Sequence, residues 1–186
     1  MPSGRCVPAA SIYRLPYPNG SFDAAFACAV FQHLAAPLEA LKELRRVLRP
    51  GGVVGVVDAS SLVIIRYPTN PLLEAWDKLH ALGQEHRTGR PAHALHLRTL
   101  LREAGFARTQ AWGHLGTEVG PAAAGTPEET RRVAEAHLIL LRGELALAQA
   151  WVTRHELEQM ADVLIAWGDA PDAFYARPGF KAIGWV

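Results

Sequence analysis

The sequence predicts an α/β fold in which buried parallel strands alternate with amphipathic helices. Residues 24–30 form an apolar run without alternation, which is typical of a strand covered on both faces. Residues 52–58 hold a second apolar run, and an amphipathic segment separates the two. A strand, a helix and a strand in this order predict one right-handed βαβ unit of a parallel sheet.

The segment between the two runs predicts a helix that starts at Pro37 and stops at Pro50-Gly51-Gly52. Its apolar side chains recur at helical spacing, and they are Leu38, Leu41, Leu44, Val47 and Leu48. Cationic side chains at positions 45, 46 and 49 favour a helix C-terminus. Ahead of the first strand, Asn19-Gly20 predicts a turn because both residues tolerate positive φ.

The later part of the chain predicts mainly helices. One is expected after Asn70, because asparagine is favoured at the N-cap, and another from about Pro91 to Gly105. Capping boxes at Thr126–Glu129 and Thr153–Glu156 predict the starts of two more. The last of these helices is expected to bury Leu157, Met160, Ala161, Leu164 and Ile165.

Length and composition predict one ordinary globular domain. The chain has 186 residues, of which 49% are hydrophobic and 20% are charged, with a formal net charge of +1. Near-neutral charge argues against a nucleic-acid-binding surface. The apolar runs are too short to cross a bilayer, and no signal peptide is recognised. Because Cys6 and Cys28 are too few for a disulfide framework, we expect a reducing cytoplasm.

Three motifs in order carry a resemblance to a known family. Leu15–Asp23 reads LPYPNGSFD, Phe31–Leu34 reads FQHL, and Leu44–Gly52 reads LRRVLRPGG. Together they resemble the central block of class I S-adenosylmethionine-dependent methyltransferases, closest to the small-molecule branch (type 11) that includes quinone-biosynthesis enzymes. The end of the chain, from Trp167 to Trp185, is also similar to one bacterial subgroup of that family.

The resemblance implies a partial Rossmann-like sheet in which strands four, five, seven and six of the family are adjacent. Residues 107–115 and 181–186 would be strands six and seven, and Arg5–Ala10 is a possible remnant of strand three. We expect a single truncated domain over residues 1–186, with a poorly defined segment at 1–14. A helical insertion or lid is expected at 120–170. Residues 1–14 hold no Gly-x-Gly-x-Gly loop, so the first strand would lack a neighbour, and its exposed edge could support a homo-oligomer.

The resemblance also implies a set of residues that bind S-adenosylmethionine. Ser11 would hydrogen-bond the adenine and Ile12 would pack on its face, with a plain polar turn as the alternative. Ala27 and Cys28 would contact the cofactor at the end of the first strand, whereas Ala29 is assigned to packing against a helix. His33 would border the methionine end and could act as a general base. The alternative for His33 is a structural histidine that hydrogen-bonds the loop backbone.

Two further residues are candidates for contact with the methyl acceptor. Asp58 ends the second strand and would face the ligand crevice, or it would cap the next turn. Tyr175 would line the lid, although aromatic residues at such places are more often core. The histidines at positions 80, 86, 93 and 96 have no Cys or carboxylate cluster to complete a ligand set, so no metal is expected.

These observations support transfer of a methyl group to a small molecule by the C-terminal part of such an enzyme. The alternative is a catalytically inactive fragment, or a binding or interaction module that retains the half-fold. A nucleotide-dependent oxidoreductase is disfavoured, because the chain has no dinucleotide-binding glycine motif. The sequence does not identify the methyl acceptor.

Overall fold

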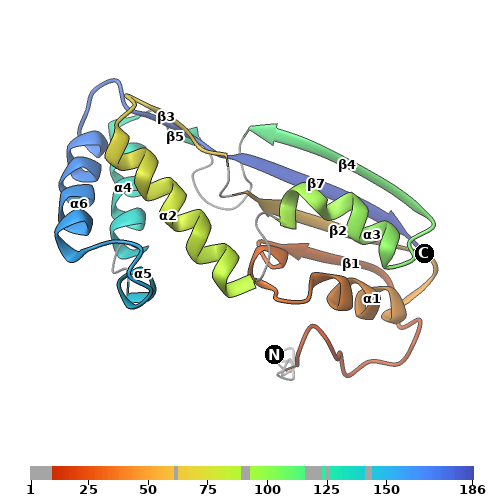
Figure 1. Cartoon of the computed structure of the whole chain (residues 1–186). Helices are drawn as coiled ribbons and strands as arrows, with labels where there is room; N and C mark the ends of the chain where they lie inside the picture. The colour runs from red at the N-terminus through yellow and green to blue at the C-terminus, as the bar shows by residue number, and fades with distance from the viewer. Residues whose placement is uncertain (1–9, 61–62, 89–92, 116–122, 125, 141–143) are drawn as a thin grey trace, which may run out of the picture.

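The computed structural model describes residues 10–60, 63–88, 93–115, 123–124, 126–140 and 144–186 (Figure 1). Most of the possible strand at Arg5–Ala10 therefore lies outside the described residues. The molecule has two parts. The sheet half holds a four-stranded sheet with two helices, and the helical half holds four helices and a small three-stranded sheet.

The main sheet confirms the predicted βαβ unit. Its strands lie in the order β1 (Phe22–Cys28), β2 (Leu48–Ala59), β7 (Pro178–Trp185) and β4 (Arg108–Leu115). β1 and β2 are parallel neighbours, whereas β7 is antiparallel to both β2 and β4. This order agrees with the sequence of strands four, five, seven and six that the resemblance implies.

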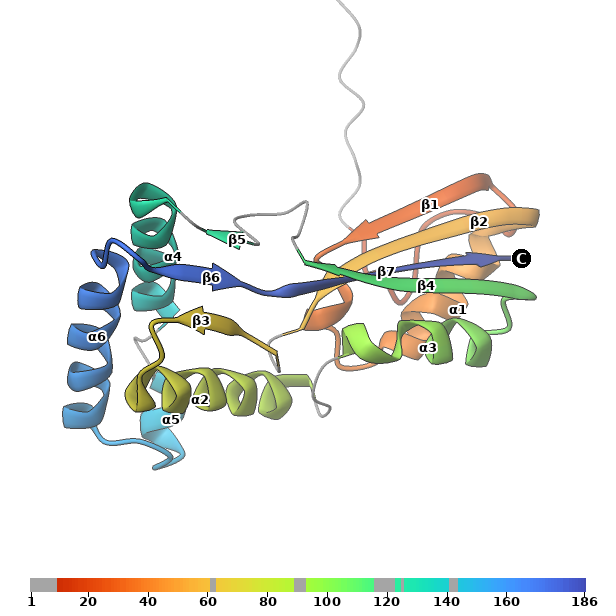
Figure 2. The same ribbon diagram turned by 90° about the horizontal axis from the view of Figure 1, so that it is seen from above.

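Two helices cover one face of this sheet, as Figure 2 shows: α1 (Pro37–Val47) and α3 (Leu97–Glu103). α1 ends before the predicted stop at Pro50, because Leu48 already pairs with Phe22 in the sheet. The buried side chains between the helices and the strands include Ala27, Leu41, Leu44, Val54, Val56, Leu97, Leu101 and Ala182. Burial of these apolar side chains is the main stabilisation of the sheet half.

The opposite face of the sheet is covered by no helix among the residues that the structure describes (Figure 2). Phe26 in β1 is 69% exposed and Trp112 in β4 is 45% exposed. The expectation that residues 24–30 are covered on both faces is therefore wrong. Burial accounts for the apolar residues on one face of β1 only, where Ala25 and Ala27 pack against the core.

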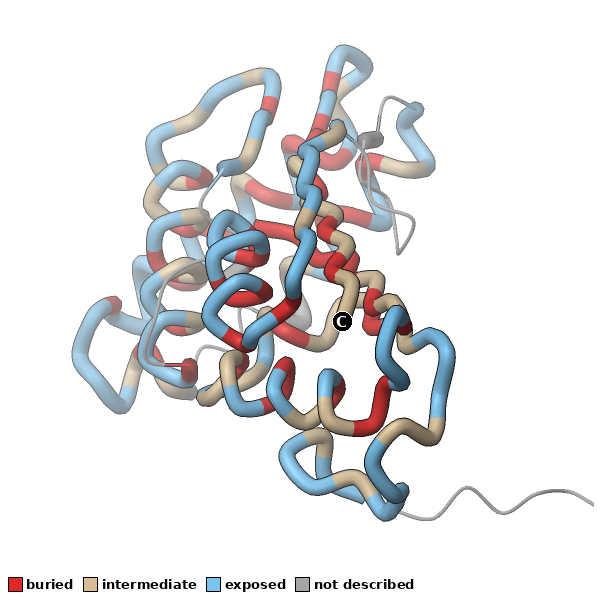
Figure 3. Tube along the Cα trace, turned by 90° about the vertical axis from the view of Figure 1, so that its right-hand side faces the viewer, coloured by how far each residue is buried: buried red, intermediate tan, exposed pale blue. Residues whose placement is uncertain are grey.

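The helical half has a core of its own. It contains α2 (Pro71–Thr88), α4 (Pro127–Leu140), α5 (Glu144–Ala148) and α6 (Arg154–Gly168), beside a sheet ordered β3 (Ile65–Tyr67), β6 (Phe174–Ala176), β5 (Ala123–Ala124). The largest buried side chains are Leu73, Trp76, Met160, Leu164, Trp167 and Tyr175. Figure 3 shows the buried segments on the inner sides of the elements and the exposed ones outside.

The capping signals place the helix starts correctly. The Thr153 hydroxyl accepts the Glu156 N–H while the Glu156 carboxylate accepts the Thr153 N–H, and Thr126 and Glu129 make the same pair of bonds. Asn70 caps α2 by accepting the Leu72 N–H at 2.9 Å. Three details differ from the prediction: α5 and the small sheet were not expected, a 3₁₀ turn at His93–His96 precedes α3, and Ile165 is 49% exposed.

Candidate functional site

A pocket lies at the carboxyl ends of the two parallel strands, where ligands of open α/β sheets bind. Its lining comes from three segments: Cys28, Ala29 and Gln32; Val57, Asp58 and Ala59; and Arg177. The enclosed space of about 20 Å³ has room for about one water molecule. A ligand as large as a nucleoside would therefore be held mainly by surface around the pocket.

Asp58 is the central polar group of this pocket. Its side chain is 2% exposed, and its Oδ2 accepts the N–H of Gln32 at 2.9 Å. Its Oδ1 is buried and has no hydrogen-bond partner among the described residues. Burial raises the pKa of Asp58 to about 6, although the N–H groups of Gln32, Ala59 and Phe31 and the charge of Arg177 act against the rise. One buried carboxyl oxygen is thus available to a ligand, on a group that titrates near neutrality.

The backbone between the strand and the loop takes a sharp turn at Ala29. Its φ of 54° is in the left-handed region, which residues other than glycine seldom adopt. The Ala29 N–H donates to the Val57 carbonyl at 2.9 Å, and Phe31, which is fully buried, anchors the 3₁₀ helix η1 (Phe31–His33). This turn carries Gln32 to the Asp58 carboxylate, so strand β2 fixes the loop that follows β1.

Among the residues proposed to bind the cofactor, the structure places Cys28 in the pocket and Ala27 in the core. Cys28 is a half-buried free thiol that lines the pocket, whereas Ala27 is 7% exposed and packs among the core side chains. Ala29, which was assigned to packing, lines the pocket instead. Alternation along β1 puts Ala27 and Cys28 on opposite faces, whereas Ala29 follows the strand and reaches the pocket through its left-handed turn.

His33, Ser11 and Ile12 are not among the residues that line the pocket. His33 is exposed at the end of η1, one residue beyond Gln32. The Ser11 carbonyl accepts the Arg14 N–H at 2.9 Å and its hydroxyl accepts the Tyr13 N–H at 3.3 Å, which forms a polar turn. Ile12 is half-buried and packs against the core of the sheet half.

Tyr175 lies in the core of the helical half rather than in the Asp58 pocket. It is 4% exposed, and its ring meets the rings of His137 and Trp167 at centroid distances of 5.5 and 6.4 Å. The guanidinium of Arg66 lies 5.6 Å from its centroid. Within the described part of the chain, no three His, Cys, Asp or Glu side chains form a group that could hold a metal ion. In the same part, no helix is long and apolar enough to span a membrane.

Gln32 and Arg177 belong to the site, although the sequence analysis did not select them. Gln32 lies inside the FQHL motif and could have been found as the neighbour of His33. Arg177 has no such signal, because it reaches the pocket only through the antiparallel pairing of β7 with β2. That pairing sets Phe180 opposite Asp58, and the Ser60 N–H donates to the Pro178 carbonyl at 3.4 Å.

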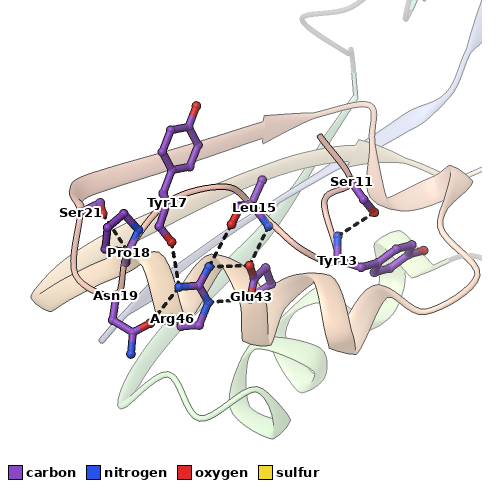
Figure 4. A network of polar contacts seen from close by, with 9 residues as sticks. All are labelled: Ser11, Tyr13, Leu15, Tyr17, Pro18, Asn19, Ser21, Glu43 and Arg46. Atoms are coloured by element: carbon purple, nitrogen blue, oxygen red, sulfur yellow. Dashed lines mark hydrogen bonds and ion pairs between the residues drawn. The ribbon is translucent and has the colours of Figure 1, made fainter. Parts of the chain in front are cut away.

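The motif that precedes β1 is held to helix α1 by hydrogen bonds to Glu43 and Arg46, two residues of that helix that also pair with each other, as Figure 4 shows. Arg46 binds Glu43 at 2.7 Å and donates to the carbonyls of Leu15 and Tyr17 and to the Asn19 side chain. Glu43 in turn accepts the Leu15 N–H at 2.7 Å. The hydrogen bond from Arg46 lowers the pKa of Glu43 to about 2. These contacts of Leu15, Tyr17 and Asn19 with α1 therefore stabilise the entry into β1, and none of the three residues lines the pocket.

Comparison with known proteins finds a family match at the N-terminal end of the chain. Residues 5–56 match the Methyltransferase domain family (Methyltransf_11). The chain is 42% identical over 98 residues to an uncharacterized 37.1 kDa protein in transposon TN4556 of Streptomyces fradiae, covering 52% of this chain and 27% of that protein. It is 37% identical over 84 residues to an uncharacterized methyltransferase of Schizosaccharomyces pombe, covering 43% of this chain and 30% of that protein. The matches thus span less than a third of each curated relative.

Similar folds occur in solved structures of low sequence identity. A candidate methyltransferase from an antibiotic biosynthesis pathway of Anabaena variabilis is 12% identical with a TM-score of 0.52, covering 92% of this chain and 70% of that one. The YcgJ protein of Bacillus subtilis is 15% identical with a TM-score of 0.50, covering 95% of this chain and 68% of that one. These likenesses concern the fold alone.

Proposed function

We propose that the chain is a class I S-adenosylmethionine-dependent methyltransferase and takes part in methyl transfer to a small-molecule acceptor. The match of residues 5–56 to the methyltransferase domain family supports this proposal. The observation that carries the proposal is the Asp58 pocket at the ends of two adjacent parallel strands. We place its action in the cytoplasm, as the two cysteines suggest.

The residues at the strand ends fit a methyl-donor cofactor. Cys28 and Ala29 are small, so a ligand can approach the backbone closely. We propose that Cys28 and Ala29 bind the cofactor near its methionine end. Around the pocket, the exposed His33 would border the same end, while Ser11 and Ile12 would hold the adenine.

Asp58 suits contact with the methyl acceptor. When bound, S-adenosylmethionine supplies an electrophilic methyl group on a sulfonium sulfur. An acceptor with an O–H or N–H nucleophile loses its proton as the new bond to carbon forms. A buried carboxylate whose pKa is about 6 can take that proton at neutral pH, and alignment of the reactants supplies much of the remaining rate. Helices within residues 120–170 would act as a lid over the acceptor.

The alternative function is a binding or interaction module that keeps the half-fold. Two observations favour it. The pocket encloses only about 20 Å³, and among the described residues β1 has a strand on one side only, with Phe26 exposed on the sheet face that no described helix covers. An exposed strand edge can pair with another chain, so we propose self-association through β1 under this alternative.

Titration calorimetry with S-adenosylmethionine tests the proposal on the purified full chain. Micromolar affinity is expected, and a Cys28→Leu substitution, which fills the pocket, should weaken binding by about tenfold or more. Ala24→Leu is the matched control, because position 24 lies on the same face of β1 and is exposed. Millimolar or absent binding by the unaltered chain, or equal effects of the two substitutions, would favour the interaction module.

A further inference from the structure

A second cavity lies in the helical half, between helix α2 and the segment that begins with α5. It has a volume of about 70 Å³, and the lining residues that matter are Trp76, His80, Gly83, Arg87, Ala146 and Trp151. Helix α2 lines this cavity and also contacts the Asp58 pocket. Gly83 lines the cavity, while its neighbour Gln84 donates a hydrogen bond of 3.0 Å to the carbonyl of Gln32 in the other pocket.

The walls of the cavity are flat and aromatic. Trp76 is 4% exposed, and the ring of His80 stacks on it with a centroid distance of 5.9 Å and an interplanar angle of 24°. Trp151 lies at the rim, half-exposed, and its ring meets His86 edge-on at 5.5 Å. Aromatic faces of this kind favour another flat ring, which packs against them by stacking or edge contact.

A glycine inside α2 keeps the cavity open. Gly83 is buried in the middle of an 18-residue helix, a position where glycine is disfavoured relative to alanine. A Cβ at this position would lie 3.4 Å from Nη1 of Arg87. The missing side chain therefore leaves room and also allows the Arg87 guanidinium to fold back over the cavity.

The charges around the cavity are positive. Burial, together with the charges of Arg177 and Arg87, lowers the pKa of His80 to about 4, so this histidine is neutral at pH 7. Both arginines raise the electrostatic potential near the ring of His80. A negative group on a ligand would be stabilised there, and a guanidinium binds a carboxylate with two parallel hydrogen bonds.

We propose that this cavity binds a small planar aromatic molecule that carries a carboxylate, with its ring against Trp76 and His80 and its carboxylate on Arg87. The site is distinct from the methyl-donor pocket. It does not depend on the function proposed above, because none of its lining residues belongs to the Asp58 pocket.

Calorimetric titration of the full chain with benzoate, and with the uncharged isostere benzamide, tests this inference. Benzoate should bind saturably, and benzamide should bind at least about tenfold more weakly. Arg87→Gln should weaken benzoate binding to a similar extent, whereas Arg102→Gln, an exposed arginine of α3, is the control that should leave it unchanged. Gly83→Leu should abolish binding by filling the cavity.

Circular dichroism establishes whether the Gly83→Leu protein folds. If it does not fold, the affinity of Arg87→Gln for benzoate tests the proposal instead, because this substitution is at an exposed position. Absence of saturable benzoate binding, equal affinity for benzamide, or an unchanged affinity in Arg87→Gln would each overturn the proposal. The affinity for S-adenosylmethionine is measured separately, so failure of one site is distinguishable from failure of the other.

Discussion

The two halves of the molecule differ in what they bury. In the sheet half, the side chains packed between α1, α3 and the strands are apolar, and the buried polar atoms without a described partner belong to Asp58 and His114, near the ends of β2 and β4. In the helical half, Arg66 and Asp77 form an ion pair of 2.7 Å in which the arginine side chain is only 5% exposed. Arg66 Nε and Nη1 and His137 Nδ1 are buried there without a hydrogen-bond partner among the described residues.

This difference shows that the halves are stabilised in different ways. An apolar core tolerates small rearrangements, whereas a buried charge is costly unless its partner stays in place. Burial and the nearby charge of Arg66 lower the pKa of His137 to about 3, so this histidine contributes no positive charge at neutral pH.

The largest effect is expected from breaking the buried ion pair. Asp77→Ala leaves Arg66 buried without its counter-charge and should lower the free energy of unfolding by about 3–5 kcal/mol. Asp169→Ala removes the partner of Arg131 in a pair whose side chains are both 58% exposed, and it should cost far less. Urea denaturation of both proteins measures the difference. Equal losses would mean that the helical half does not depend on its buried charges.

Asp58, at the seam between the halves, should make stability depend on pH. Its pKa in the folded chain is raised from 3.8 to about 6, so the folded state binds more protons than the unfolded state between these values. Stability should therefore fall as pH rises from about 4 to 6, by on the order of 2–3 kcal/mol from this group.

Asp58→Asn should remove that part of the pH dependence while keeping the acceptor for the Gln32 N–H. Thermal unfolding of the two proteins at pH 4 and pH 7 provides the comparison. If the unaltered chain and Asp58→Asn respond identically to pH, the Asp58 carboxyl is not desolvated as described.

A smaller effect is expected from overpacking the sheet half. A Cβ on Gly184 would lie 2.9 Å from Phe106 and 3.0 Å from Leu101, so Gly184→Ala should cost about 1–3 kcal/mol. Gly113→Ala is the matched control, because a Cβ there meets Phe180 at an ordinary 3.6 Å. Chemical denaturation should separate the two, and a neutral Gly184→Ala would show that this core is looser than the structure indicates.

The sequence predicts the sheet half better than the helical half. Apolar runs, helical spacing and the stop at Pro50 were enough for the βαβ unit, because each depends on neighbours along the chain. The small sheet was missed because β3 and β6 are three residues each, too short to show a period. Coverage of the strand faces was also misjudged, since burial depends on what packs there rather than on the strand itself.

For the candidate site too, the sequence predicted the residues that depend on local patterns and missed those that depend on tertiary contacts. Asp58 and Cys28 were found because strand ends can be located from the apolar runs. Arg177 was missed because only tertiary pairing brings it to the pocket. For Tyr175 the sequence left a lid and a core position open, and the structure buries it in the core of the helical half, beside Arg66. The sequence analysis placed Ala27 at the cofactor and Ala29 in packing, whereas the structure places Ala29 in the pocket. The left-handed turn at Ala29 causes this difference, and no local sequence pattern predicted it.

Alkylation of Cys28 tests most directly whether the pocket at the ends of β1 and β2 holds the methyl donor. Iodoacetamide labelling of the full chain is followed by mass spectrometry, with and without S-adenosylmethionine, and Cys6, the second thiol of the chain, reports any general effect of the cofactor on the reagent. The labelling rate of Cys28 should fall as the cofactor concentration rises, while that of Cys6 stays constant. An unchanged rate at Cys28, or an equal fall at both cysteines, would contradict the assignment of this pocket.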